Sequence, residues 1–140
     1  MSKVAVVYWT GTGNTEAMAD AVVEGIIEAG GEAKLIFSDD FNASMMNDFD
    51  AIAFGCPAMG DEVLEEMSFD PMFTDCEKDL KGRKIAIFGS YEWNNGEWME
   101  DWEKRCVEAE ANLAYPPLPA YDAPNEEAIA KCRELGAALV

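Results

Sequence analysis

The sequence predicts an α/β fold built on a doubly wound parallel sheet with helices on both faces. Strand-like and helix-like segments alternate along the chain, which is the pattern of successive βα units. Residues 51–55 and 84–89 are nearly continuous apolar runs, typical of strands buried on both faces. In such sheets, ligands bind beyond the carboxyl ends of the strands. The loops that leave the first, third and fourth strands are therefore the segments to inspect; they span residues 9–15, 56–66 and 90–97.

Each expected element has its own local signal. Short apolar runs predict strands at residues 4–9, 33–37, 51–55, 84–89 and, more weakly, 113–115. Apolar residues at helical spacing predict helices at 16–29, 96–111 and 125–139, with a weak helical turn at 42–46. Gly30 and Gly31 end the first helix, and Asn125 is a good N-cap for the last one. Prolines between residues 116 and 119 leave the end of the fifth strand open.

The composition is that of one acidic domain. With 140 residues, 49% of them hydrophobic, the chain can bury a single core, so we expect one domain over residues 1–140. A formal net charge of −18 repels nucleic acid and anionic membranes and favours basic partners. Met1 leads directly into the first strand, and no apolar stretch approaches the ~18 residues of a membrane span. We expect a soluble, cytoplasmic protein.

The four cysteines form no recognisable metal or redox motif. Cys56, Cys76, Cys106 and Cys132 are widely spaced without a C-x-x-C pair, and the chain has no histidine to complete a zinc site. We expect reduced thiols. A redox role for Cys56 is the alternative, but no neighbouring Lys, Arg or second Cys is present to lower its pKa, so an inert, buried thiol is favoured.

A loop rich in glycine and threonine joins the first strand to the first helix, with the sequence Thr10-Gly11-Thr12-Gly13-Asn14-Thr15. Two glycines let backbone N–H groups approach an anion, and the helix N-terminus adds the positive end of its dipole. The loop has neither the lysine of a Walker loop nor G-x-G-x-x-G spacing. It predicts a site for one monophosphate held by neutral donors. Helix capping by Thr and Asn is the alternative, although capping alone does not require both glycines.

The other two loops suit a flat aromatic ligand. The segment Cys56-Pro57-Ala58-Met59-Gly60-Asp61-Glu62 places a thioether beside a glycine and two acids. The segment from Ser90 to Trp98 places aromatic residues on a polar turn, which core packing explains poorly. Together with the phosphate loop, these segments predict a ligand with an aromatic ring and a phosphate tail.

Three motifs carry a family resemblance: Thr10-x-Thr12-Gly13-Asn14-Thr15, then Gly55-Cys56-Pro57-Ala58-Met59-Gly60, then Gly89-Ser90-Tyr91-x-Trp93 with Gly96-Glu97-Trp98. Their order and spacing resemble a short-chain bacterial flavodoxin of the anaerobe type, over essentially the whole chain. The resemblance implies a five-stranded sheet of order 2-1-3-4-5 and a tightly but non-covalently bound FMN. It implies an electron-transfer protein rather than an enzyme: a low-potential one-electron carrier that shuttles between semiquinone and hydroquinone.

The resemblance also assigns roles within the loops. The phosphate would be held by Thr10, Thr12, Gly13, Asn14 and Thr15. The inner face of the flavin ring would contact Met59 and the outer face Trp93; the alternatives are gap filling in the core and a loop anchor. The full set of expected FMN contacts is Thr10, Gly11, Thr12, Gly13, Asn14, Thr15, Cys56, Pro57, Ala58, Met59, Gly60, Asp61, Glu62, Ser90, Tyr91, Glu92, Trp93 and Gly96.

Met59, Gly60, Glu92 and Trp93 are expected to tune the redox chemistry. The peptide after Gly60 would turn over on the first reduction, so that the Gly60 carbonyl accepts a hydrogen bond from the flavin N5; a plain turn glycine is the alternative. Glu92 stands where the family often has glycine, and its charge would oppose formation of the anionic hydroquinone.

Further contacts to the ring edges are implied in the same way. Glu62 would reach the flavin N3 edge unless it is solvated. Backbone N–H groups of Ala58, Glu92 and Trp93 would donate to the pyrimidine end of the ring. The resemblance leaves open whether Tyr121 or Asp122 approaches the flavin.

Two sets of residues outside the motifs are expected to have other roles. Trp98 and Trp102, four apart on one helix, are expected to pack in the core. The acids between residues 61 and 66 are expected to be solvated and to form part of a docking surface, with a metal site as the weaker alternative. The expected partners are redox proteins with basic docking surfaces. The protein itself is expected to be a monomer.

Three other functions compete. An FMN-dependent reductase such as a quinone reductase is the runner-up, but it would need longer loops over the flavin. A phosphoacceptor domain would need acids where the first and third strands end, and the chain has Trp9-Thr10 and Gly55-Cys56 there. A binding module without flavin would be colourless.

Overall fold

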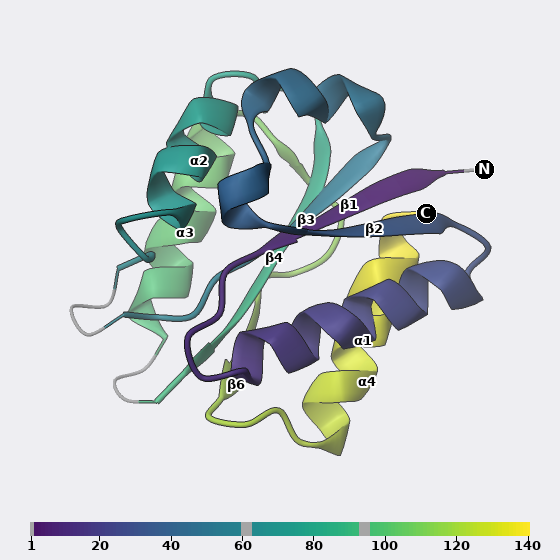
Figure 1. The fold of residues 1–140 in the computed structure, drawn as a ribbon, viewed down its shortest axis with the longest axis vertical. Coiled ribbons are helices and arrows are strands. Elements are labelled where there is room, and N and C mark those ends of the chain that lie inside the picture. The colour runs from purple at the N-terminus through teal and green to yellow at the C-terminus, as the bar shows by residue number, and fades with distance from the viewer. Residues whose placement is uncertain (1, 60–62, 93–95) are drawn as a thin grey trace.

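The structure is a computed structural model that describes residues 2–59, 63–92 and 96–140, and a parallel sheet lies between two layers of helices (Figure 1). Its strands are β1 (Lys3–Tyr8), β2 (Glu32–Phe37), β3 (Ala51–Gly55), β4 (Lys84–Tyr91), β5 (Asn112–Leu113) and β6 (Leu118–Tyr121). Its helices are α1 (Asn14–Glu28), α2 (Phe69–Glu77), α3 (Glu97–Glu108) and α4 (Glu126–Ala138), with short 3₁₀ segments η1 (Ser38–Asp40) and η2 (Ala43–Asp48).

The strand order is β2-β1-β3-β4-β5, with β6 also paired to β4, and every pairing is parallel. This confirms the doubly wound α/β fold and the order 2-1-3-4-5. The five-strand expectation needs a correction, because the strand expected at 113–115 is split into β5 and β6. Pro116 and Pro117 interrupt the ladder, since proline has no N–H to donate. Strand β4 pairs with β5 at its start and with β6 at its end, where Tyr91 pairs with Tyr121.

The two faces of the sheet bury different helices. On β1, Val4 and Val6 face the cluster formed by α1 and α4, whereas Ala5 and Val7 face the cluster formed by α2 and α3. Successive side chains of a strand point to opposite faces of the sheet. Both sets are apolar here because helices cover both faces. Figure 1 shows α1 and α4 on one side of the sheet and α2 and α3 on the other.

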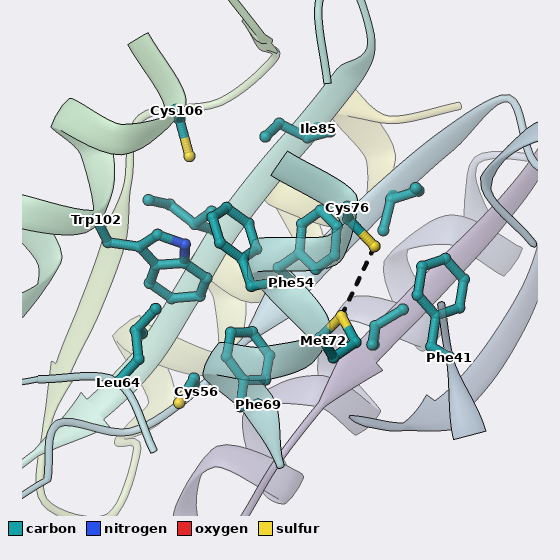
Figure 2. Close-up of a cluster of buried hydrophobic side chains, with 14 of the residues drawn as sticks. Phe41, Phe54, Cys56, Leu64, Phe69, Met72, Cys76, Ile85, Trp102 and Cys106 are labelled. Atoms are coloured by element: carbon teal, nitrogen blue, oxygen red, sulfur yellow. Dashed lines mark hydrogen bonds between the residues drawn. The ribbon is translucent and has the colours of Figure 1, made fainter. Parts of the chain in front are cut away.

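Helix α2 is an element that the sequence patterns did not reveal. Phe69, Met72, Phe73 and Cys76 recur at helical spacing and are all buried. Figure 2 shows Phe69, Met72 and Cys76 in one buried cluster with Phe54 and Trp102. The Phe73 ring lies 5.1 Å from the Phe54 ring and 5.8 Å from the Trp102 ring. Pro71 obscures the pattern, but it lies in the first helical turn, where its missing N–H would have no intrahelical partner.

The four cysteines are free and buried. Burial raises the pKa of Cys76, Cys106 and Cys132 to about 12, and raises the pKa of Cys56 further. The thiols are therefore protonated at neutral pH. Within the described residues, no helix has both the length and the apolar character that crossing a membrane requires.

Candidate cofactor site at the carboxyl edge of the sheet

The loop between β1 and α1 presents a helix N-terminus without a side-chain cap. Gly13 is the N-cap residue, with a left-handed φ of 98°, and as a glycine it has no side chain to cap the helix. A glycine adopts this φ without the strain that a Cβ introduces. Inside the loop, the Gly13 N–H donates to Thr10 Oγ1 at 3.0 Å. The Asn14 N–H makes only a long hydrogen bond to Thr12 Oγ1, at 3.5 Å, and no side chain of the described residues accepts from the N–H groups of Thr15 or Glu16. These N–H groups can therefore bind an anion.

Thr15 connects this loop to β4. Its side chain is buried at 1% exposure, and its hydroxyl lies 3.1 Å from Ser90 Oγ. Thr15 Oγ1 also accepts a hydrogen bond from the Ser90 N–H at 3.4 Å. The Thr15 hydroxyl therefore links the start of α1 to β4.

The loop after β3 is held against β4 and α3 by hydrogen bonds from both sides. The Ala58 N–H donates to the Ser90 carbonyl at 2.9 Å, so this N–H is already used within the protein and is not free for a ring edge. The Met59 N–H donates to the Val63 carbonyl at 3.0 Å. Trp98 Nε1 donates to the Cys56 carbonyl at 3.2 Å. Trp98 is buried as expected, and its indole N–H also positions the start of the loop.

Aromatic contacts arrange the third loop. The Tyr91 ring lies 5.5 Å from the Trp98 ring and 5.5 Å from the Tyr121 ring. The Asp122 N–H donates to the Tyr91 carbonyl at 2.6 Å. Tyr121, the last residue of β6, and Asp122, which follows it, thus both contact Tyr91, and Tyr91 lines the site.

One open pocket joins the three loops. It is lined by Trp9, Gly11, Thr12, Pro57, Ala58, Met59, Ser90, Tyr91 and Glu92. The aromatic rings and the thioether give it walls that suit a flat ring. The uncapped helix N-terminus lies at the end of the same loop that supplies Gly11 and Thr12, so one ligand can place its phosphate there. The residues present therefore fit FMN.

A model of the flavodoxin family matches residues 6–136. The flavodoxin of Clostridium beijerinckii is 42% identical over 131 residues, 94% of each chain. The flavodoxin of Megasphaera elsdenii is 40% identical over 96% of each chain. The solution structure of that two-electron reduced flavodoxin superposes with a TM-score of 0.88 over 97% of both chains. The chain belongs to the flavodoxin family.

As a flavodoxin, the protein binds FMN and carries electrons; it is not an enzyme, and the reductase alternative is not favoured. Flavodoxins pass these electrons to redox partner proteins.

The flavodoxin pocket brings together many of the residues expected from the sequence. Gly11, Thr12, Pro57, Ala58, Met59, Ser90, Tyr91 and Glu92 all line it. Thr10, Gly13 and Cys56 lie in the same loops without lining it, and Asn14 and Thr15 lie in the first turn of α1. Gly96 is the N-cap of α3. The predictions for Gly60, Asp61, Glu62 and Trp93 fall on residues outside the described parts of the chain.

Two site residues were missed or misjudged. Trp9 lines the pocket, and a Cβ at Gly11 would approach its ring to 3.1 Å, so the ring lies over the phosphate loop. The sequence did offer a signal for Trp9, since it is an aromatic residue between the first strand and the phosphate loop. Glu65 was expected to be a solvated acid, but it is 5% exposed and accepts hydrogen bonds from the first turn of α2. A buried carboxylate satisfied by backbone donors has no signature in composition alone.

Proposed function

We propose that residues 1–140 form one domain that binds FMN non-covalently at the carboxyl edge of the sheet and acts as a low-potential one-electron carrier. The observation that carries the proposal is the convergence of the three loops on one pocket beside an uncapped helix N-terminus. Bound there, FMN supplies reversible one-electron chemistry that no side chain of the site can supply.

The phosphate lies, in this proposal, at the N-terminus of α1. Backbone N–H groups of the helix's first turn donate to it, and hydroxyls of Thr10 and Thr12 donate from the loop. Thr10 Oγ1 already accepts from the Gly13 N–H, so its own O–H is free to donate outward. Without lysine in this loop, the helix dipole and fixed N–H groups balance the charge of the phosphate.

The ring lies, in this proposal, between Met59 and Trp93. Met59 lines the pocket and its backbone is held by Val63, which supports the inner position. The outer position of Trp93, the peptide turnover at Gly60 and the contact of Glu62 with the N3 edge are proposed from the family resemblance. Glu92, which is exposed and lines the pocket, opposes a second negative charge on the ring.

We further propose that the protein meets basic docking surfaces on its partners, as a monomer in the cytoplasm. None of the loops at the carboxyl edge contains lysine or arginine: this holds for residues 9–15, 38–42, 56–68, 92–97 and 122–127. All of them except residues 9–15 contain acids. Such an edge attracts basic surfaces and orients them toward the flavin. The free, buried thiols suit a reducing compartment.

A titration of the protein with FMN tests the proposal. We expect binding at one FMN per chain, a visible flavin spectrum, two separate one-electron steps in a reductive titration, and negligible turnover with NAD(P)H and a quinone. A colourless protein that takes up no FMN would contradict the proposal. Rapid two-electron turnover would favour a reductase instead.

A further inference from the structure

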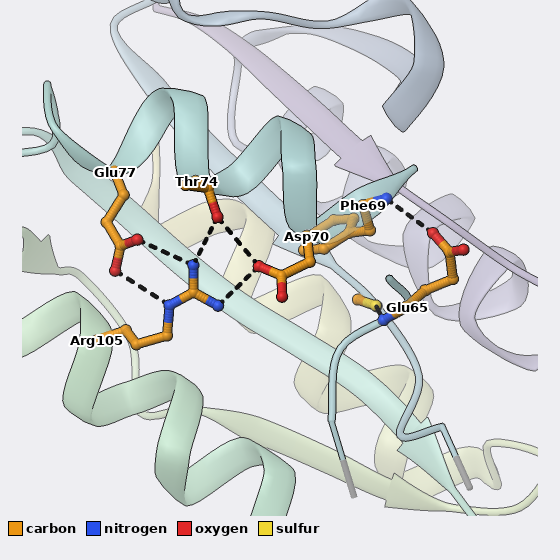
Figure 3. A network of polar contacts seen from close by, with 7 residues as sticks. Glu65, Phe69, Asp70, Thr74, Glu77 and Arg105 are labelled. Carbon is orange, nitrogen blue, oxygen red and sulfur yellow. Dashed lines mark hydrogen bonds and ion pairs between the residues drawn. The ribbon is translucent and has the colours of Figure 1, made fainter. Parts of the chain in front are cut away.

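Glu65 is a buried acid that connects the loop after β3 to helix α2. Its side chain is 5% exposed. Glu65 Oε1 accepts hydrogen bonds from the N–H groups of Ser68 at 2.7 Å and Phe69 at 2.8 Å, and Oε2 accepts from Met67 at 2.8 Å. Figure 3 shows Glu65 at the start of α2, and the hydrogen bond to Phe69 is drawn there.

The carboxylate replaces the usual helix cap. Ser68 is the N-cap residue of α2, but its side chain makes no capping hydrogen bond. Its hydroxyl instead lies 2.5 Å from Ser38 Oγ and also donates to Asp39. Glu65 supplies the missing acceptors and places a negative charge at the positive end of the helix dipole. No lysine or arginine within the described ranges forms an ion pair with it.

The backbone of Glu65 closes the base of the flavin loop. Its N–H donates to Cys56 Sγ at 3.4 Å, and Cys56 is the residue at which β3 passes into the loop. Above this contact, the Met59 N–H donates to the Val63 carbonyl at 3.0 Å. The Cys56 carbonyl is itself fixed by Trp98. Glu65 thus contacts the end of β3 through its backbone N–H and the start of α2 through its carboxylate. The loop that carries Met59 runs between these two elements.

We propose that Glu65 is a positioning residue for FMN. It does not line the pocket. It acts by fixing the loop that presents Ala58 and Met59 to the ring, and so sets the affinity for FMN and the two one-electron potentials. This inference rests on the proposed FMN site, because Glu65 acts through residues that are proposed to contact the ring.

The variant Glu65→Gln removes the charge and one of the acceptor oxygens, so an amide N–H₂ must face a backbone N–H. Glu66→Gln is a matched control: Glu66 is the exposed neighbour and loses the same charge. We expect the dissociation constant for FMN to rise about tenfold or more in Glu65→Gln, given the usual energy of hydrogen bonds to a charged group. We expect the separation between the two one-electron potentials of the FMN-saturated protein to change as well. Glu66→Gln should keep the wild-type affinity for FMN, and any change in its potentials measures the loss of one charge at this edge alone.

The test separates positioning from stability alone. Thermal unfolding of each FMN-free protein measures the structural cost of the variant. If Glu65→Gln unfolds at a lower temperature but retains the affinity and potentials of Glu66→Gln, the inference is wrong. If the wild type itself takes up no FMN, the proposed function fails instead.

A measurement on the wild type needs no variant and covers the case in which Glu65→Gln does not fold. Amide hydrogen exchange of Met67, Ser68 and Phe69 should slow when FMN binds, although none of them lines the pocket, because linkage between loop and helix cap is reciprocal. Slowed exchange at Met59 with no change at these N–H groups would overturn the inference.

Discussion

The two edges of the parallel sheet differ in charge and in what their loops are built to do. The loops at the carboxyl edge contain no lysine or arginine, and three of them line one pocket. At the opposite edge, Lys78, Lys81, Arg83 and Lys84 lie where α2 ends and β4 begins, and each of them contacts another group of the protein. Arg83, for example, donates to the Met46 carbonyl and to Asn47.

A glycine with positive φ occurs at both edges, but its role differs between them. Gly13 at the carboxyl edge and Gly82 at the amino edge both have positive φ, at 98° and 74°, and a Cβ at either would meet no atom within 4 Å. Gly82 forms part of a tight turn and its N–H donates to the Glu110 carbonyl. Gly13 is a helix N-cap without a side chain, and no side chain of the described residues accepts from the N–H groups of Thr15 or Glu16. The comparison teaches that a left-handed glycine marks a ligand site only where it leaves donors free.

Gly13→Ala and Gly82→Ala test this contrast with the largest expected effect. Both variants place a Cβ at positive φ, and each should lose about 1–2 kcal/mol of stability for that reason. Only Gly13→Ala distorts the phosphate cradle, so only it should weaken FMN binding, by about tenfold or more. Fluorescence titration of FMN with each protein gives the affinities, and thermal unfolding gives the stabilities. Equal affinities in the two variants would remove the distinction between the edges.

Glu92→Gln tests the charge at the carboxyl edge, with Glu108→Gln as an exposed control on α3. Removing the Glu92 charge makes a second negative charge on the flavin less unfavourable, so the lower one-electron potential should become less negative. Screening by salt limits the change to a few tens of millivolts, and it should shrink as salt is added. Glu108→Gln should leave the potential unchanged. An unchanged potential in Glu92→Gln at low ionic strength would show that Glu92 does not act on the ring.

Asp40→Asn and Asp79→Asn test whether the acidic edge steers partners. Both acids are exposed, Asp40 in η1 near the carboxyl edge and Asp79 beyond α2 near the amino edge. With cytochrome c as a basic electron acceptor, Asp40→Asn should slow its reduction by about twofold at low salt, because steering depends on charge near the docking site. Asp79→Asn should have a smaller effect. Stopped-flow rates over a range of ionic strength measure both, and identical slopes against salt would argue for steering by net charge alone.

Asp75→Asn tests an interaction of the amino edge, where only stability should change. The Ala43 N–H and then Lys78 lower the pKa of Asp75, through a hydrogen bond of 3.0 Å and an ion pair of 3.3 Å. A lowered pKa gives stability that is present above the ordinary value near 3.8 and is lost as pH falls through the folded value. The variant should therefore unfold more easily than wild type at neutral pH, and the difference should close in acid. FMN affinity should be unchanged; a loss of affinity would link the two edges.

Much of the fold could be read from the sequence because its central strands are apolar on both faces. The run at 51–55 gave β3 with its observed bounds, and Asn125 caps α4 by accepting from the Ala128 N–H at 2.8 Å. The split of β5 and β6 could not be predicted. Whether the chain rejoins the sheet after Pro117 depends on pairing with Ser90 and Tyr91, which is a long-range contact.

The composition of the pocket was predictable, but the supports behind it were not. Gly11, Met59 and Tyr91 lie where motifs placed them, because loops after parallel strands meet at one edge. The partner of each supporting hydrogen bond could not be predicted. That Thr15 turns to Ser90, or that Glu65 caps α2, depends on packing between segments far apart in the chain.

The central claim is that FMN binds at the carboxyl edge, with its phosphate at the N-terminus of α1. An NMR titration of the FMN-free protein with FMN tests it most directly, by following every backbone amide. We predict the largest shifts at residues 11–16, 57–59 and 90–92, with Gly82 and the other amides of the amino edge nearly unmoved. Shifts concentrated at the amino edge, or absent from residues 11–16, would contradict it.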